Sequence, residues 1–200
     1  SVGFDENLSL FQLMQSPDPE EMFDENYAFF SGTSKYMVSH FKNFSNQIKE
    51  RLKNISEKKK VIEIGCNDGI MLQNFSNKLE YDYLGIEPSK NVYAVAKEKN
   101  LSVINDFFTY ELAFNLTNYQ KKTDVIYAAN VICHIPDLNN LFNGIEELLN
   151  KKGVFIFEEP YLGDVIRLTS YDQIYDEHVY LFSLLSVGKI SKLFDLEIID

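Results

Sequence analysis

The sequence predicts an α/β domain with a mostly parallel sheet, helices on both faces of that sheet, and a helical lead-in at the N-terminus. Short stretches rich in Val and Ile alternate with helical patterns of roughly ten residues, which is typical of parallel strands joined by crossover helices. At 200 residues with 45% hydrophobic side chains, the chain is long enough for one such domain with a sizeable core.

Residues 1–56 are expected to form a lead-in or lid followed by one long helix. Proline, serine and glycine punctuate the first part around a short acidic helix expected at 20–25. Between 34 and 55, apolar residues recur at spacings of three and four, which favours one face of a helix. Residues 57–200 should form the ligand-binding core, and the apolar run that ends the sequence predicts that this core continues beyond residue 200.

Within the core, strands and helices should alternate. Strands are expected at 61–64, 83–86, 101–104, 124–129, 154–158 and 196–199. Helices are expected at 69–78, 89–99, 109–118, 137–150 and 183–194. Because open parallel sheets bind ligands at the carboxyl ends of their strands, the loops after these strands should hold the site.

Composition excludes several classes of function. A net charge of −11 and a pI near 4.8 argue against a nucleic-acid partner, which would require clustered Lys and Arg. The two cysteines, Cys66 and Cys133, have neither the spacing of a metal site nor that of a disulfide framework, so no metal is expected and a reducing cytoplasm is favoured. No apolar run is long enough to span a membrane.

The turn after the first core strand, 65–69, carries the clearest ligand signal. Its glycines allow a sharp turn and a close approach of the ligand. The glycine fingerprint of dinucleotide-binding proteins would have glycine where Asn67 stands, so the sequence argues against NAD as the ligand. Glu63 and Asp68 flank the turn and favour a cationic ligand without phosphate, while Glu87 ends the next strand and can accept both hydroxyls of a ribose. S-adenosylmethionine, with its sulfonium and ammonium groups, meets these requirements.

The stretch 61–69 resembles motif I of the class I S-adenosylmethionine-dependent methyltransferases, and 85–88 resembles the strand end that binds ribose in that family. The resemblance implies a Rossmann-like fold, S-adenosylmethionine as cofactor and S-adenosylhomocysteine as product. It also implies contacts to adenine after the third strand and to the methionine half after the fourth. The cofactor-binding residues expected on these grounds are Glu63, Gly65, Cys66, Asn67, Asp68, Gly69, Glu87, Pro88, Asp106, Phe107, Asn130 and His134.

The loop after the fifth strand is expected to hold the acceptor. It brings Tyr175, Glu177 and His178 into four residues. A histidine beside carboxylates and phenols suits a general base, because its unperturbed pKa of about 6.5 lies near working pH. A histidine exposed in an acidic loop is the alternative interpretation.

Stretches 159–164 and 175–178 resemble the sugar C-methyltransferases that act on nucleotide-linked 4-keto-6-deoxyhexoses. In that family the last histidine of the second motif is implicated as the base, which implies this role for His178. The sequence departs from the family in two ways. Asp176 stands where the family motif often has histidine, and no cysteine precedes Cys66. The zinc module of the family is therefore not expected, and its large C-terminal domain is not part of these 200 residues.

The resulting hypothesis is methyl transfer to a carbohydrate or phosphorylated precursor in surface polysaccharide (capsule or lipopolysaccharide) or deoxysugar biosynthesis of a bacterium. His178, supported by Glu177, would remove a proton from the acceptor, and Tyr175 or Tyr27 would donate a hydrogen bond to the developing oxyanion. Transfer to carbon or to oxygen stays open. The alternatives are an O-methyltransferase acting on a small phosphate-bearing capsule substituent, and a cofactor-binding module without activity of its own.

Overall fold

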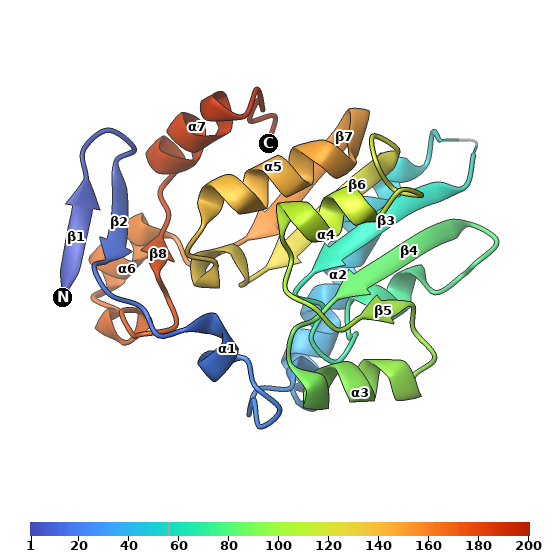
Figure 1. Cartoon of the computed structure of the whole chain (residues 1–200), viewed down its shortest axis with the longest axis horizontal. Helices are drawn as coiled ribbons and strands as arrows, with labels where there is room; N and C mark the ends of the chain where they lie inside the picture. The colour runs from blue at the N-terminus through green and yellow to red at the C-terminus, as the bar shows by residue number, and fades with distance from the viewer. Residues whose placement is uncertain (56) are drawn as a thin grey trace.

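The computed structural model describes residues 1–55 and 57–200 (Figure 1). The predicted boundary between lead-in and core falls at residue 56, which lies outside the described residues. The strands are β1 (Val2–Asp5), β2 (Leu10–Leu13), β3 (Lys59–Ile64), β4 (Tyr81–Ile86), β5 (Val103–Ile104), β6 (Thr123–Ala129), β7 (Leu149–Glu158) and β8 (Tyr180–Leu181). The α-helices are α1 (Pro19–Met22), α2 (Lys35–Leu52), α3 (Lys90–Glu98), α4 (Tyr110–Asn115), α5 (Leu138–Leu148), α6 (Leu162–Leu168) and α7 (Leu184–Leu193). Short 3₁₀ turns are η1 (Ser31–Thr33), η2 (Leu72–Phe75), η3 (Ile132–His134) and η4 (Tyr171–Gln173).

The main sheet has the order β5-β4-β3-β6-β7, and its paired strands are all parallel. This confirms the predicted α/β fold of the Rossmann-like class. The chain proceeds from β3 to β4 on one side and later returns to β6 on the other side of β3. The strand order therefore reverses beside β3, and the crevice at its carboxyl end is where ligands bind in such sheets.

Helices cover both faces of the sheet, as predicted (Figure 1). On one face Ile62 and Ile64 of β3 belong to a core cluster with Leu141 and Ile145 of α5. On the other face Val61 packs in a cluster with residues of α2 and η2. The alternation along β3 follows from the pleat of a strand, which points successive side chains to opposite faces.

The predicted helix at 69–78 is wrong, because only the 3₁₀ turn η2 forms there. Side chains compete with the backbone in this segment: Asn74 Nδ2 donates to the carbonyl of Met71 at 2.9 Å, and Gln73 Nε2 donates to that of Ile70 at 2.8 Å. The long helix predicted at 34–55 is confirmed as α2, and Ser34 caps it by accepting from the backbone N–H of Met37.

The first residues of the chain form an antiparallel hairpin, β1–β2, where an irregular lead-in was expected. Strand β2 also pairs with β8, so the hairpin belongs to a second, three-stranded sheet. Leu10 anchors this sheet in the main core with only 1% of its surface exposed. Because the pairing partner lies about 170 positions away in the sequence, a local pattern could not reveal it. The short acidic helix is present as α1, with Asp18 as its cap.

The strand predicted at 196–199 is also wrong. Within the described residues, β7 is an edge strand paired with β6 on one side. The apolar residues Leu196, Ile198 and Ile199 instead line a groove beside β7. No helix among the described residues is both long enough and apolar enough to cross a membrane.

Candidate active site

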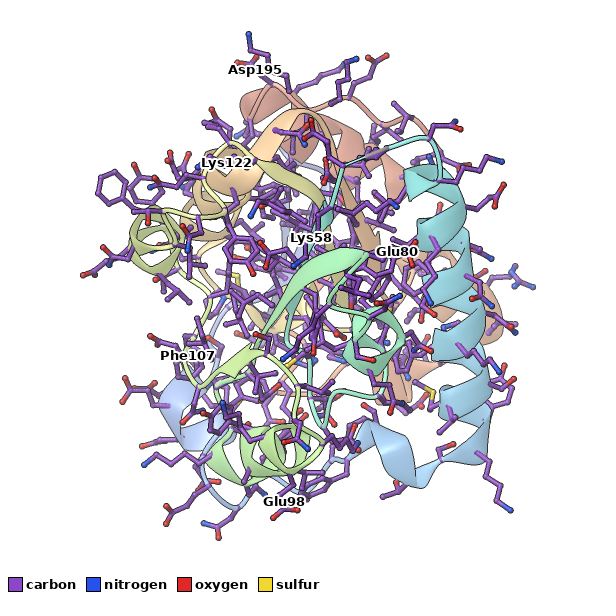
Figure 2. All side chains as sticks on the ribbon, turned by 90° about the vertical axis from the view of Figure 1, so that its right-hand side faces the viewer. Lys58, Glu80, Glu98, Phe107, Lys122 and Asp195 are labelled. Carbon is purple, nitrogen blue, oxygen red and sulfur yellow. The ribbon has the colours of Figure 1, made fainter. Side chains whose placement is uncertain are left out.

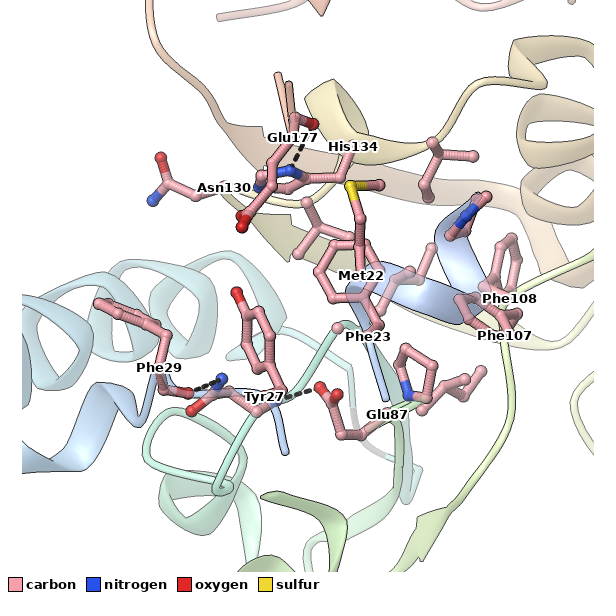
Figure 3. Close-up of a pocket in the computed structure, with 18 of the residues that line it drawn as sticks. Met22, Phe23, Tyr27, Phe29, Glu87, Phe107, Phe108, Asn130, His134 and Glu177 are labelled. Carbon is pink, nitrogen blue, oxygen red and sulfur yellow. Dashed lines mark hydrogen bonds between the residues drawn. The ribbon is translucent and has the colours of Figure 1, made fainter. Parts of the chain in front are cut away.

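A cavity of about 1220 Å³ lies at the carboxyl ends of β3, β4 and β6. Its floor includes Ile64, Ile86 and Ala129, which are among the last residues of those strands. The lead-in crosses one side and the loop before β8 closes another, and Figure 3 shows their side chains converging on the space between them. The cavity is large enough for a nucleoside cofactor together with a small acceptor.

Most of the expected site residues line this cavity. The twelve that do are Tyr27, Gly65, Asn67, Glu87, Pro88, Asp106, Phe107, Asn130, His134, Tyr175, Glu177 and His178. The four expected residues that do not line it are Glu63, Cys66, Asp68 and Gly69. All four belong to β3 or the turn after it. The correction concerns the direction of the side chains of Glu63, Cys66 and Asp68, and the position of Gly69 at the far end of the turn.

The glycine turn has the conformation that its sequence predicts. Gly65 and Gly69 have φ of 65° and 76°, a region that favours glycine. A Cβ on Gly65 would lie 2.4 Å from Cγ2 of Val131, so the turn after β6 packs directly against it. The N–H of Gly65 donates to the carbonyl of Ile86 at 2.8 Å, which joins the ends of β3 and β4.

The side chains of Asn67 and Asp68 hold the lead-in to this turn. Asn67 accepts from the N–H of Ser31 at 2.9 Å and donates to the carbonyl of Phe29 at 3.1 Å (Figure 3). Asp68 accepts from the N–H of Gly32 at 3.1 Å and is buried. The carboxylate expected to face a cationic ligand thus fastens the lead-in across the cavity.

Glu63 lies behind the turn, on the face of β3 that packs toward α2. The hydroxyl of Tyr127 donates to its carboxylate at 2.7 Å, and burial raises the pKa of Glu63 well above its usual range. The Sγ of Cys66 is buried close by, and its nearest acceptor is the carbonyl of Asn67 at 3.8 Å. These residues support the turn from below rather than contacting the cavity.

The Tyr127→Phe variant should lower the free energy of unfolding by about 1–3 kcal/mol, because it leaves the buried Glu63 carboxyl without its donor. Urea unfolding measures this value. Tyr93→Phe, on α3, serves as the matched loss of a phenol hydroxyl and should change stability far less. Equal losses in the two variants would contradict the role of the Glu63–Tyr127 pair.

Glu87 directly follows β4, with its carboxylate at the cavity (Figure 3). Its two oxygens accept from the N–H groups of Asn67 at 2.8 Å and Ser89 at 2.9 Å. Burial raises the pKa of Glu87, and these two bonds oppose the rise. A carboxylate held in this way keeps further lone pairs for two hydroxyls, so the site fits the ribose of S-adenosylmethionine.

The expected adenine end is formed by Asp106 and Phe107, which both line the cavity. Asp106 also accepts from the N–H of Phe107 at 2.8 Å, which fixes its position. Phe108 lines the cavity too but is 7% exposed and belongs to the main core. Sequence reasoning missed Asn105, whose side chain donates to the carbonyls of Glu87 at 2.9 Å and Pro88 at 2.6 Å and so joins the ends of β4 and β5.

His178 is buried in the wall of the cavity that faces the lead-in. Its Nδ1 donates to the carbonyl of Gln173 at 2.9 Å, and its Nε2 accepts from the Tyr175 hydroxyl at 3.1 Å. Burial lowers the pKa of His178, so the imidazole is neutral at pH 7 with its lone pair on Nε2. The sequence predicts that the Glu177 carboxylate supports His178. The structure corrects this, because the backbone carbonyl of Gln173 orients the ring.

His134 lies beside His178, with ring centroids 5.0 Å apart. Its Nδ1 donates to the backbone carbonyl of Glu177 at 2.8 Å, and burial lowers its pKa to about 4. His134 therefore belongs to the acceptor side of the cavity as much as to the methionine side for which it was predicted. The ring of Phe23, which sequence reasoning missed, packs edge-on against His134 at 5.7 Å (Figure 3).

Tyr27 lies between the two halves of the cavity. Its phenol is close enough to Glu87 and Glu177 for both carboxylates to add to the effect of burial, which together raise its pKa. The phenol therefore stays protonated and can donate. Asn91 of α3 donates to its backbone carbonyl at 2.8 Å and holds the residue in place.

One group of described residues has atoms close enough to share a metal ion. The ligand atoms of Cys133, His134 and His178 lie within 4.8 Å of one another. Burial and the neighbouring Glu159 raise the pKa of the Cys133 thiol far above its usual range, which opposes the thiolate that a metal needs. The geometry thus gives weak support for a metal at this position.

Glu159, missed as a site residue, supports the turn that carries Asn130 and His134. Its Oε1 accepts from the N–H groups of Val131 at 2.8 Å and Ile132 at 2.7 Å. Its Oε2 is buried without a partner among the described residues, and burial raises its pKa to about 7. The Glu159 carboxyl, which directly follows β7, is therefore largely protonated below neutral pH in the folded protein.

This pKa predicts a pH dependence of stability. Because the pKa of about 7 lies above the usual 4.5, the contribution of Glu159 is fully present below about pH 4.5 and is lost as pH rises through about 7. Glu159→Gln keeps an uncharged side chain at this position. Between pH 4.5 and 7, its free energy of unfolding should change by about 1–3 kcal/mol less than that of the unaltered chain. Urea unfolding of both proteins at a series of pH values measures the difference, and identical slopes would contradict it.

Comparisons with known proteins agree with this geometry. Residues 38–200 match the family described as a methyltransferase domain. The C-methyltransferase NovU of Streptomyces niveus is 26% identical over 194 residues, which cover 96% of this chain and 45% of that protein. A tRNA U34 carboxymethyltransferase of Campylobacter jejuni subsp. doylei is 31% identical over 121 residues, or 60% of this chain and 41% of that protein. The chain spans less than half the length of the curated relatives it matches.

Solved structures share the fold. The CurJ carbon methyltransferase superposes with a TM-score of 0.61 at 16% identity over 85% of this chain and 52% of that chain. A methyltransferase from Archaeoglobus fulgidus gives a TM-score of 0.60 at 14% identity over 80% and 74%. With a matching domain over most of its length and a cavity that fits S-adenosylmethionine, the chain belongs to the methyltransferase domain family and has the class I methyltransferase fold.

Proposed function

We propose that this methyltransferase acts on a carbohydrate precursor of surface polysaccharide or of a deoxysugar in the bacterial cytoplasm, with His178 as general base. The observation that carries the proposal is the Tyr175–His178 pair in the cavity wall, with its neutral imidazole and fixed tautomer. The pair shares the cavity with Glu87, the residue we assign to the cofactor ribose.

Glu87 and the glycine turn would hold S-adenosylmethionine, which would supply an electrophilic methyl group and would be left as the thioether S-adenosylhomocysteine. In the chain, Nε2 of His178 takes the proton that leaves the acceptor. The hydroxyl of Tyr175 then turns from Nε2 to the acceptor oxygen, where it donates to the developing negative charge together with Tyr27. His134 and Phe23 border the acceptor and hold it in line with the sulfur.

Carbon is the favoured acceptor atom. NovU and CurJ are both named as carbon methyltransferases. For transfer to carbon, the proton must lie next to a ketone, because an unactivated C–H is far too weak an acid for an imidazole. Transfer to a hydroxyl needs only the same base, so O-methylation is the second candidate.

A small molecule is favoured over RNA as acceptor. Some relatives are named for modifying tRNA, and they match 60–69% of this chain. A net charge of −11 opposes a polyanionic partner, since phosphate binding depends on clustered cations.

Mass spectrometry after incubation with trideuteromethyl-labelled cofactor tests the proposal. Candidate acceptors are nucleotide-linked 4-keto-6-deoxyhexoses and cell-wall glycan precursors. We expect one labelled methyl per acceptor, and the carbon shift of that methyl by NMR distinguishes attachment to carbon from attachment to oxygen. Cofactor binding without transfer to any carbohydrate would contradict the proposal and support a binding module without activity.

A further inference from the structure

The walls of the cavity are strongly acidic. No lysine or arginine is found among the described residues that line it. The acidic residues that line it are Asp18, Glu20, Asp24, Glu87, Asp106, Glu111, Asp137 and Glu177. Six of these acids are exposed to solvent, whereas Glu87 and Glu177 are less exposed. An anion bound inside the cavity would therefore meet these two carboxyl groups and no side-chain cation of the described lining apart from a protonated histidine.

The lysines of the core lie elsewhere. Lys58 and Lys122 directly precede β3 and β6, at the amino ends of strands whose carboxyl ends form the cavity. Figure 2 shows Lys122 in the upper part of the molecule and Phe107, a residue of the cavity, in the lower part. Lys60, in the same region, forms an ion pair with Asp82, with 2.6 Å between its Nζ and a carboxylate oxygen. The lysines named here thus lie outside the cavity.

The reacting centre lies among the acidic residues of the cavity. Glu177 and Glu87 flank Tyr27 from the acceptor side and the cofactor side (Figure 3). The faces of Phe23, Tyr27 and Tyr175 border the same space and attract cations or neutral rings. Because the site is partly closed to water, like charges repel there more strongly than at an open surface.

We propose that this cavity rejects negative charge at the reacting centre, so that it transfers a methyl group but not a carboxymethyl group and admits only a neutral or positively charged part of the acceptor. The inference rests on the cofactor position of the proposed function. It distinguishes the chain from the carboxymethyltransferases that it matches over 121 residues. It also opposes a small phosphate-bearing acceptor, because a nucleotide-linked sugar can leave its phosphates outside the cavity and a small phosphate ester cannot.

Two cofactor analogues of equal size test the inference by binding alone. One carries a carboxymethyl group on the sulfonium sulfur in place of methyl, and the other carries the uncharged carbamoylmethyl group. Isothermal titration calorimetry should show the carboxymethyl analogue binding at least about tenfold more weakly. The difference should shrink when salt is raised from about 50 mM to about 500 mM, because salt screens the repulsion.

Glu177→Gln should narrow the difference in affinity between the two analogues, since it removes one of the two acids that flank Tyr27. Glu146→Gln, on the outer side of α5 beside Lys121, should leave the difference unchanged. Equal or tighter binding of the carboxymethyl analogue, or a difference insensitive to Glu177→Gln, would overturn the inference while leaving the cofactor site intact. Failure of both analogues and of S-adenosylmethionine to bind would overturn the proposed cofactor site as well.

Discussion

The His178→Ala variant should transfer methyl groups about 10²- to 10⁴-fold more slowly than the unaltered chain, while its affinity for S-adenosylhomocysteine stays the same. The loss follows from the removal of the buried imidazole whose Nε2 accepts from the Tyr175 hydroxyl in the cavity wall. Initial rates with labelled cofactor, together with calorimetric binding of S-adenosylhomocysteine, separate the two effects.

His40→Gln is the matched control, because His40 lies outside the cavity and pairs with Glu158 at 2.8 Å on the side of α2. This variant should keep its rate. The rate of the unaltered chain should fall in acid, at a pH lower than for an ordinary histidine, since burial lowers the pKa of His178 and the neutral form must act as base. Full turnover by His178→Ala would remove the base assignment and leave Tyr175 or His134 as the candidates.

The Glu87→Ala variant should bind S-adenosylhomocysteine about ten- to a hundredfold more weakly, which corresponds to about 1.5–3 kcal/mol for hydrogen bonds to a charged group. Two causes add: the ribose hydroxyls lose their acceptor, and the N–H groups of Asn67 and Ser89 lose the carboxylate that fixes the glycine turn. Calorimetry measures the affinity.

Glu98→Gln provides the control for Glu87, because it removes a carboxylate from the end of α3 outside the cavity. Its affinity for S-adenosylhomocysteine should match that of the unaltered chain. Urea unfolding of Glu87→Ala shows whether the turn still folds. A stable Glu87→Ala protein with unchanged affinity would contradict the ribose assignment.

The parallel sheet could be predicted because its signals are local. The stretch at 61–64 and the glycines at 65 and 69 specify a strand and a turn by themselves, and alternation along the chain implies the rest. Elements that depend on distant partners could not be predicted. The hairpin β1–β2 needs β8, and residues 196–199 resemble a strand but have no partner strand among the described residues.

The same distinction applies to the site. Residues at strand ends, such as Glu87 and Asn130, were predicted to meet because the carboxyl ends of parallel strands share one edge. Side-chain direction was not predictable where the bonding partner is remote. Asp68 turns to the N–H of Gly32, 36 positions away, and His178 is oriented by a backbone carbonyl that no residue type could reveal.

A crystal structure of the chain with bound S-adenosylhomocysteine tests the central claim most directly. The account predicts that the ribose hydroxyls contact the carboxylate of Glu87 and that the thioether sulfur faces the space between Tyr27, Tyr175 and His178. A cofactor bound away from Glu87, or one with its sulfur directed away from His178, would contradict it.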